Sequence, residues 1–289
     1  MNKKTCFIRT ISFWFFFLFI TTRVSAQDST NTIESHPFVL GKIETIHSTV
    51  LSEKRIVNIY LPPGYNTSDS IRYPVIYLLD GSADEDFIHI AGLLQFLNFS
   101  WINIAPPAVL VGIANVDRKR DFTFPTSIKK DVEAFPTAGK SENFIQFIEK
   151  ELQPYIEGRY KTTSDKTIIG QSLGGLLATE ILYKKPALFT RYMIISPSLW
   201  WDNESLLKTK LNLQTLPGKE TVKVFIAVGK EGPIMENDAK KLLNILKGQP
   251  KKINVSFAYF SNENHASIMH NALYKGFEII HAATQKKLK

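Results

Sequence analysis

The spacing of apolar and polar residues changes along the chain. Residues 44–50 and 54–61 alternate between the two kinds, which is typical of antiparallel strands with one buried face. Uninterrupted apolar runs, typical of parallel strands covered on both faces, follow at residues 73–79, 107–113, 192–195 and 222–228. Further strands are predicted at residues 166–169 and 255–260. The pattern therefore predicts a sheet that begins with an antiparallel pair and continues with parallel strands.

Segments with helical periodicity alternate with these strands. The predicted helices cover residues 141–155, 173–184, 236–246 and 267–281. Ser141 is expected to cap the first helix, and Pro186 follows the end of the second. Residues 82–100 and 115–137 are predicted to be loop-rich segments that roof a site. Strands that alternate with helices predict an α/β fold, with a mostly parallel sheet and helices on both faces.

One serine stands at the junction of a strand and a helix. The pentapeptide Gly170-Gln171-Ser172-Leu173-Gly174 follows the strand at 166–169 and opens the helix at 173–184. This is the G-x-S-x-G pattern of a nucleophile elbow, in which the serine takes a strained backbone conformation and the glycines let strand and helix approach. The helix N-terminus also directs backbone N–H groups at any oxyanion formed there. The pattern predicts Ser172 as the nucleophile of an α/β-hydrolase fold.

A serine hydroxyl needs a base to accept its proton, and in this fold the base follows the nucleophile and the acid along the chain. Three histidines follow the serine, namely His265, His270 and His281. His281 lies among apolar residues of the terminal helix, which favours a packing or surface role. His265 lies in the polar loop directly after the last strand. We predict His265 as the base, with His270 as the alternative.

The acid is expected in the loop after the strand at 222–228. Glu231 stands closest to the end of this strand and is the predicted acid. Glu236 and Asp238 are the alternatives, although both are also typical of a first helical turn, where the helix dipole favours negative charge. Glu263 is an outside candidate, because its place two residues before the predicted base makes the geometry awkward.

A tetrahedral intermediate needs two N–H donors. Leu173, directly after the nucleophile, is expected to supply one of them. The second is expected from the loop after the strand at 73–79, where either Gly81 or Ser82 is placed to donate, since glycine lets the backbone turn inward. Asp80 in the same loop is expected to form structural hydrogen bonds rather than to take part in catalysis.

The first 26 residues have the character of an export signal. Lys3, Lys4 and Arg9 precede an apolar run at 11–20, and a small-residue segment ends at Ala26. A membrane-spanning helix needs about 20 apolar residues, roughly twice the length of this run. We predict cleavage after Ala26, with an uncleaved anchor as the alternative, no stable membrane insertion afterwards, and a periplasmic or secreted protein.

Charge and composition exclude several function classes. The chain has a net charge of +8, and the leader contributes four of the cations and no anion, so +4 remains after cleavage. This charge is too mild to predict a nucleic acid partner. The single cysteine, Cys6, lies in the leader, and no metal-ligand pattern or phosphate loop follows, so no metal and no cofactor are expected.

The chain after the leader is predicted to have two parts. Residues 27–40 are predicted to be a loose extension, and residues 41–289 a single catalytic domain.

Several motifs beyond the elbow resemble one protein family. They lie at residues 55–65, 73–81, 170–175, 196–201 and 264–266, with a looser match at 120–123. Together, over residues 40–280, they resemble the Putative esterase family of α/β hydrolases. This family includes siderophore (enterobactin-type) esterases, S-formylglutathione hydrolases, feruloyl and acetyl-xylan esterases, and mycolyltransferases.

The resemblance implies roles for individual residues. Ser172 matches the family's nucleophile, and His265 matches its base. Members vary between Asp and Glu at the acid, and some siderophore esterases use a serine–histidine pair alone, so the role of Glu231 stays open. The Ser-Leu-Trp-Trp segment resembles the siderophore-esterase branch. Trp200 and Trp201 are therefore predicted to form one wall of an acyl or aromatic pocket, with core packing of at least one as the alternative.

The sequence thus predicts an exported serine esterase that acts through an acyl-enzyme on Ser172. Its expected partner is a small-molecule siderophore-type ester or a glycan-linked ester. An acyltransferase with the same triad, and a non-catalytic ligand-binding protein on the same scaffold, are the alternatives. The leader argues against cytosolic S-formylglutathione hydrolysis. Specificity is expected to reside in the loops at 82–100 and 115–137.

Overall fold

The computed structural model describes residues 34–216 and 221–285. The predicted leader and residues 27–33 of the predicted extension lie outside this range. Contacts within the chain define two compact units, Met1–Phe38 and Val39–Lys289. Only residues 34–38 of the first unit are described, and they form neither helix nor strand. All elements below belong to the second unit.

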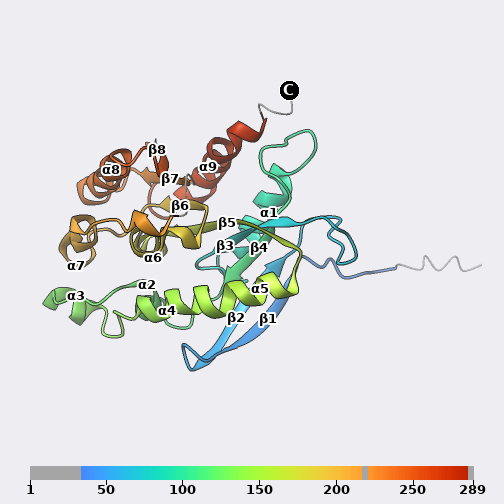
Figure 1. Cartoon of the computed structure of the whole chain (residues 1–289), viewed down its shortest axis with the longest axis horizontal. Helices are drawn as coiled ribbons and strands as arrows, with labels where there is room; N and C mark the ends of the chain where they lie inside the picture. Colours follow the sequence, from blue (N-terminus) through green and yellow to red (C-terminus); the bar gives the residue numbers. More distant parts are fainter. Residues whose placement is uncertain (1–33, 217–220, 286–289) are drawn as a thin grey trace, which may run out of the picture. The chain divides into compact units, whose positions relative to one another are not determined.

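Eight strands, counted over the described residues, form one sheet in the order β1-β2-β4-β3-β5-β6-β7-β8 (Figure 1). The strands are β1 (Lys42–Ser48), β2 (Glu53–Tyr60), β3 (Tyr73–Leu78), β4 (Val109–Ile113), β5 (Thr162–Gln171), β6 (Arg191–Ile195), β7 (Val222–Gly229) and β8 (Ile253–Phe260). β2 pairs antiparallel with both β1 and β4, and every other pairing is parallel. The predicted α/β fold, with its leading antiparallel pair, is confirmed.

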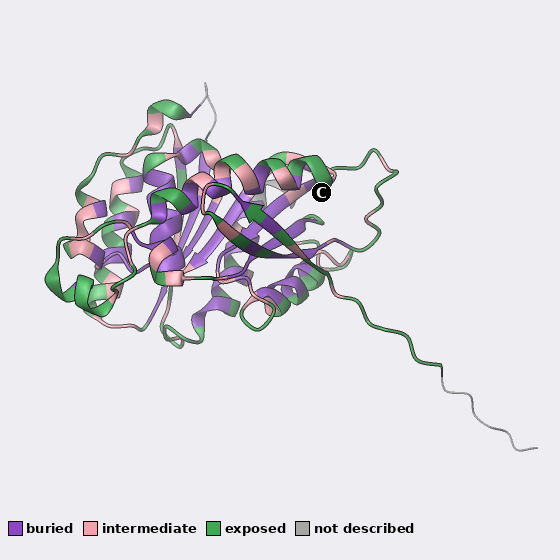
Figure 2. Ribbon diagram, turned by 90° about the horizontal axis from the view of Figure 1, so that it is seen from below, coloured by how far each residue is buried: buried purple, intermediate pink, exposed green. Residues whose placement is uncertain are grey.

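Helices cover both faces of this sheet. One face carries α4 (Ser141–Phe147), α5 (Gln153–Arg159), α6 (Leu173–Lys184) and α8 (Pro233–Lys247). The other face carries α1 (Phe87–Leu97) and α9 (Ile268–Gln285). Shorter helices are α2 (Arg118–Phe122), α3 (Lys129–Ala134) and α7 (Trp201–Glu204). In Figure 2 the central strands are buried and the outer sides of the helices are exposed. Each face of the sheet forms its own hydrophobic core.

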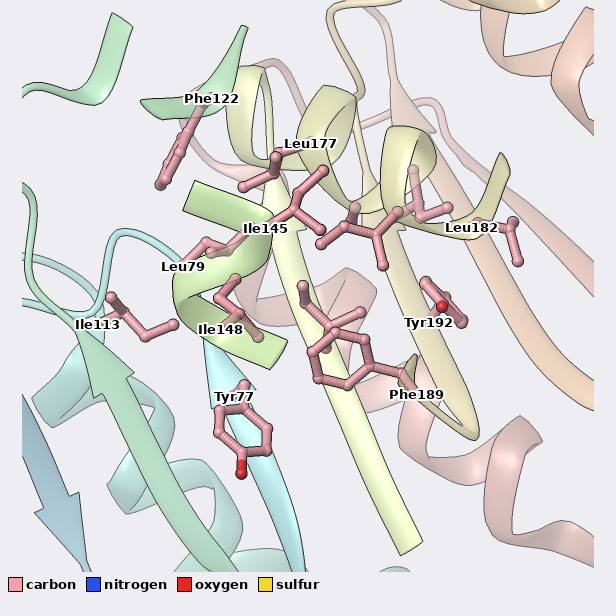
Figure 3. Close-up of a cluster of buried hydrophobic side chains, with 14 of the residues drawn as sticks. Tyr77, Leu79, Ile113, Phe122, Ile145, Ile148, Leu177, Leu182, Phe189 and Tyr192 are labelled. Atoms are coloured by element: carbon pink, nitrogen blue, oxygen red, sulfur yellow. The ribbon is translucent and has the colours of Figure 1, made fainter. Parts of the chain in front are cut away.

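The uninterrupted apolar runs are explained by these two cores. Successive side chains of a strand point to opposite faces, so in β3 Tyr77 packs into the larger core and Leu78 into the smaller one. Figure 3 shows part of the larger core, where Tyr77 and Leu79 lie with Leu177 and Phe189. The rings of Tyr77 and Phe189 meet edge to face, with centroids 5.6 Å apart. Burying each such side chain stabilises the fold by about 1.5–3 kcal/mol.

The prediction of a loop over residues 82–100 is wrong, because α1 occupies its centre. Phe87, Ile90, Ala91 and Leu94 follow the i, i+3, i+4, i+7 pattern of an amphipathic helix, and all four are buried. A stripe this short is marginal alone, and packing against the sheet and α9 stabilises it. The second predicted loop, residues 115–137, likewise contains the short helices α2 and α3.

The predicted helix at 141–155 extends to Arg159. Ser141 is its first helical residue and is fully buried, while Lys140 occupies the N-cap position, so the predicted cap is wrong. A π-helical turn at Ile148–Leu152 ends two residues before Pro154. Proline has no N–H to donate to the preceding turn, and a widened turn is one way in which a helix accommodates it.

His281 has the packing role that its position on the terminal helix favours. It is buried, and its ring stacks on Phe277 with centroids 6.1 Å apart. Burial, together with the positive charges of Arg191 and Lys223, lowers the pKa of His281 to about 4. Its ring is therefore neutral in the folded protein at neutral pH.

The free energy of unfolding is expected to fall as the pH drops from about 6.5, the pKa of an unfolded histidine, to about 4. In this interval the unfolded chain binds a proton at His281 that the folded chain does not bind, which costs about 3 kcal/mol of stability. His281→Leu should remove this component of the slope. Urea unfolding of both proteins across the interval measures it, and identical slopes would contradict the assignment.

Candidate active site

Ser172 lies in a tight turn between β5 and α6. Its backbone is strained, with φ 58° and ψ −120°, and its N–H donates to the carbonyl of Ile195 at 3.1 Å. A Cβ on Gly170 would lie 2.3 Å from the carbonyl oxygen of Gly174, and one on Gly175 would lie 2.9 Å from Pro197. Only glycine fits these two positions, so the turn has the geometry of the predicted elbow.

Glu231 and His265 are in direct contact. Glu231 follows β7, His265 follows β8, and His265 Nδ1 lies 2.5 Å from Glu231 Oε2. The two loops are joined by the N–H of Lys230, which donates to the carbonyl of Glu263 at 2.7 Å. The side chain of Glu231 is 3% exposed and that of His265 is 47% exposed. The carboxylate is thus shielded, while the imidazole reaches solvent.

The other oxygen of this carboxylate, Glu231 Oε1, accepts two hydrogen bonds. Ser196 Oγ donates to it at 2.5 Å, and the N–H of Gly229 donates at 2.9 Å. Burial raises the pKa of Glu231, but the hydrogen bonds from His265, Ser196 and Gly229 outweigh burial and hold the pKa below its usual value. The carboxylate is therefore ionised at neutral pH and faces the imidazole as an acceptor.

The alternative acids have other partners. Glu236 accepts the N–H groups of Glu231 and Gly232, both at 3.2 Å, as a first-turn acid of α8. Asp238 is buried and pairs with Lys241 at 3.1 Å. Glu263 accepts hydrogen bonds from Ser267 and Asn271. Of the four candidates, Glu231 is the one whose carboxylate meets His265.

The alternative base is also engaged elsewhere. His270 Nδ1 lies 2.8 Å from Nε2 of His89 on α1, with the two rings nearly parallel. This pair joins the start of α9 to α1. The cavities that Ser172 lines include His265 in their walls, whereas His270 lines neither of them.

The hydroxyl of Ser172 opens on two adjoining cavities. One, of about 610 Å³, is lined on its apolar side by Trp200, Met235 and Ala266. The other, of about 380 Å³, is lined by the charged residues Asp80, Glu85, Asp86 and Arg118. Ser172 and His265 line both cavities. An ester carbonyl placed at Ser172 would therefore have an apolar region on one side and a charged region on the other.

The two candidates for the second oxyanion donor differ in the structure. The N–H of Gly81 donates to the carbonyl of Ile113 at 3.0 Å, so Gly81 is not the free donor that the sequence allowed. A Cβ on Gly81 would lie 2.4 Å from Gly112 Cα, so packing against β4 explains the glycine. The N–H of Ser82 contacts only the exposed carboxylate of Glu85, at 3.3 Å. Ser82 is the remaining candidate beside Leu173, the first residue of α6.

The two tryptophans have different environments. Trp200 lines the larger of the two cavities. Trp201 is fully buried, and its Nε1–H donates to the carbonyl of Phe124 at 2.9 Å. The prediction of a pocket wall is therefore wrong for Trp201, which is fully buried and packs in the core, as the alternative allowed.

Three polar residues at the site were not identified from the sequence. Arg118 forms a two-pronged ion pair with Asp80, at 2.6 and 2.9 Å, which gives Asp80 its expected structural role. Ser198 Oγ lies 3.3 Å from Ser172 Oγ. Gln171, inside the elbow motif, donates its side-chain amide to the carbonyl of His265. These contacts bridge distant parts of the chain, so no local pattern marks them.

The described residues contain no cluster of three or more side chains suited to hold a metal ion. Within the same residues, no helix is both long and apolar enough to cross a membrane.

Comparison with known proteins finds one family. The family model described as Putative esterase matches residues 48–271. The chain is 31% identical to the ferri-bacillibactin esterase BesA of Bacillus subtilis over 264 residues, which cover 84% of this chain and 90% of that protein.

Solved structures show the same relationship. The BES protein from Bacillus cereus superimposes with a TM-score of 0.74 at 30% identity, covering 86% of this chain and 97% of that chain. An IroE-like serine hydrolase from Shewanella oneidensis superimposes with a TM-score of 0.69 at 28% identity, covering 82% of this chain and 79% of that chain. The fold described above is therefore shared with a solved serine hydrolase of the α/β-hydrolase fold.

Proposed function

The chain belongs to the Putative esterase family and is a carboxylic ester hydrolase, and from this premise we propose that it is an exported enzyme that cleaves siderophore-type esters through an acyl-enzyme on Ser172. The observation that carries the mechanism is the 2.5 Å contact between Glu231 and His265 beside a cleft that Ser172 also lines. The contact between the two neighbouring loops supports an oriented imidazole in the wall of that cleft.

In the proposed acylation step, Ser172 Oγ attacks the ester carbonyl and passes its proton to Nε2 of His265. Glu231 accepts the Nδ1–H bond and stabilises the imidazolium. The N–H groups of Leu173 and Ser82 hold the oxyanion. The C–O bond then breaks, and His265 returns the proton to the departing alcohol. In the second half, water attacks the acyl-enzyme with His265 again as base, and Ser172 is released with the carboxylic acid.

The substrate class is proposed from the relatives and from the cleft. BesA acts on ferri-bacillibactin by its name, and it aligns along most of both chains. The cleft offers Trp200 and Met235 for an aromatic or apolar group, and Arg118 and Lys230 as cations near Ser172. An ester that joins an aromatic acyl group to a polar, hydrogen-bonding backbone suits these two sides.

Export is proposed from the sequence of the leader alone. Lys3, Lys4 and Arg9 precede an apolar run that ends in a small-residue segment before residue 27. N-terminal sequencing of the protein recovered from fractionated cells tests it, and a mature protein that begins at Gln27 is the expected result. A cytosolic protein that retains Met1 would contradict it.

The enzyme is expected to hydrolyse a triscatecholate siderophore lactone faster than a feruloyl sugar or acetylated xylan. Rates on this panel, with the siderophore both iron-loaded and iron-free, measure the preference. A burst of released alcohol at mixing is expected if an acyl-enzyme accumulates. Fastest turnover of the glycan esters would overturn the substrate proposal.

Two further measurements test the alternative functions. With added alcohols, an excess of transfer product over free acid would favour an acyltransferase. Failure to label the enzyme with a fluorophosphonate would favour the non-catalytic alternative.

A further inference from the structure

Ser196 directly follows β6 and has an unusual backbone and environment. Its φ is 42°, in the left-handed region that non-glycine residues seldom adopt. Its side chain is fully buried, and its N–H donates to the carbonyl of Ala227 at 2.8 Å. Backbone strain of this kind persists only where surrounding contacts hold it. Here the strained residue aims its hydroxyl at Glu231.

The hydroxyl of Ser196 meets the oxygen of Glu231 that faces away from the histidine. Ser196 Oγ to Glu231 Oε1 is 2.5 Å, and His265 Nδ1 to Glu231 Oε2 is also 2.5 Å. The last torsion of a glutamate side chain is broad and does not fix the plane of its carboxylate. Hydrogen-bond partners therefore decide which way the two oxygens point. The remaining donor, the N–H of Gly229, reaches the same oxygen at 2.9 Å.

We propose that Ser196 is a positioning residue for hydrolysis, whose hydroxyl holds the Glu231 carboxylate in the orientation that meets His265. The inference rests on the proposed role of Glu231 as the acid partner of His265. Removing the hydroxyl leaves a buried carboxylate oxygen with one donor in place of two and lets the carboxylate turn. The hydrogen bond to Nδ1 then lengthens, and the imidazole loses its fixed tautomer and direction.

Ser196→Ala is expected to lower kcat by about 10- to 100-fold with little change in KM, as expected for a misplaced catalytic group. Alanine removes the hydroxyl but must still adopt the strained backbone. Ser196→Gly is therefore the second variant, because glycine adopts a positive φ without steric cost. Loss of kcat in both variants assigns the effect to the hydroxyl. Wild-type kcat in either variant, once its folding is verified by circular dichroism, would overturn the proposal.

A matched control is Ser141→Ala. Ser141 is equally buried, but its hydroxyl lies beside Glu180 at the contact of α4 with α6. This variant is expected to keep the wild-type kcat. A similar loss of activity in Ser141→Ala would show that any lost buried hydroxyl reduces activity, and would overturn the assignment to Ser196.

Two readouts separate positioning from a general structural role. The proton shared between His265 and Glu231 is expected to give a far-downfield NMR resonance, and Ser196→Ala should weaken or shift it. Ser196→Ala should also cause no further loss of kcat in a Glu231→Gln background, since it acts through Glu231. Multiplied losses, or an unchanged resonance, would overturn the inference. A wild-type enzyme without esterase activity would instead overturn the proposed function, so the two failures are distinct.

Discussion

Ser172→Ala is expected to lower kcat for ester hydrolysis by about 10⁶-fold, which corresponds to about 8 kcal/mol of transition-state stabilisation. In the proposed mechanism this hydroxyl forms the covalent intermediate, so its removal prevents acylation. The melting temperature should change little, because alanine keeps the Cβ and the same backbone path at φ 58°. Single-turnover assays on an activated ester, with thermal unfolding of the same samples, measure both.

The neighbouring hydroxyl of Ser198 provides the control for this prediction. Ser198 Oγ lies 3.3 Å from Ser172 Oγ and is nearly buried. Ser172→Ala is compared with the double variant that also carries Ser198→Ala. If residual turnover is lost only in the double variant, Ser198 acted in place of Ser172. Turnover within tenfold of the wild type in the double variant would rule out a serine nucleophile at this elbow.

Glu231→Gln is expected to lower kcat by about 10⁴-fold, the loss seen when a triad acid is replaced by its amide. The structure gives the reason. Ser196 and the N–H of Gly229 both donate to the position of Oε1, so the amide oxygen must lie there. The amide NH₂ then faces His265, which must accept at Nδ1 and carry its proton on Nε2. In that tautomer Nε2 cannot accept the proton of Ser172.

Glu263→Gln is the matched control for this substitution. Glu263 lies in the same loop as His265, but its carboxylate accepts hydrogen bonds from Ser267 and Asn271. Its replacement should change kcat little. The opposite result, with kcat lost in Glu263→Gln and retained in Glu231→Gln, would transfer the acid role to Glu263. Steady-state kinetics of the two variants decide between them.

Local sequence patterns were enough to predict the elbow, the leading strand pair and the carboxylate that contacts His265. The elbow is a local motif, because the turn itself excludes a side chain at Gly170. The alternation of apolar and polar residues at 44–50 and 54–61 likewise indicates strands with one buried face, and the structure pairs β1 with β2 as predicted. The position of Glu231 at the end of a strand was enough to select it from four carboxylates, and the structure places it against His265.

What the sequence missed depends on contacts between distant residues. Ser196 and Arg118 find their carboxylate partners 35 and 38 residues away, so no spacing rule marks them. α1 was missed because its short apolar stripe becomes helical through packing on α9 and the sheet. Trp200 and Trp201 were both predicted in a pocket wall from the resemblance of the segment that they share, whereas the direction of each indole is decided by the tertiary structure.

The order of β5 to β8 along both the chain and the sheet has a consequence for synthesis. Each strand delivers one part of the proposed site in turn, and the base comes from the last strand. A nascent chain that has emerged as far as β7 holds the nucleophile and the acid but no base. Because domains are synthesised from the N-terminus, hydrolytic competence arises only after the loop that follows β8 has been made, so the appearance of activity during cell-free translation of the chain without its leader would report completion of the site.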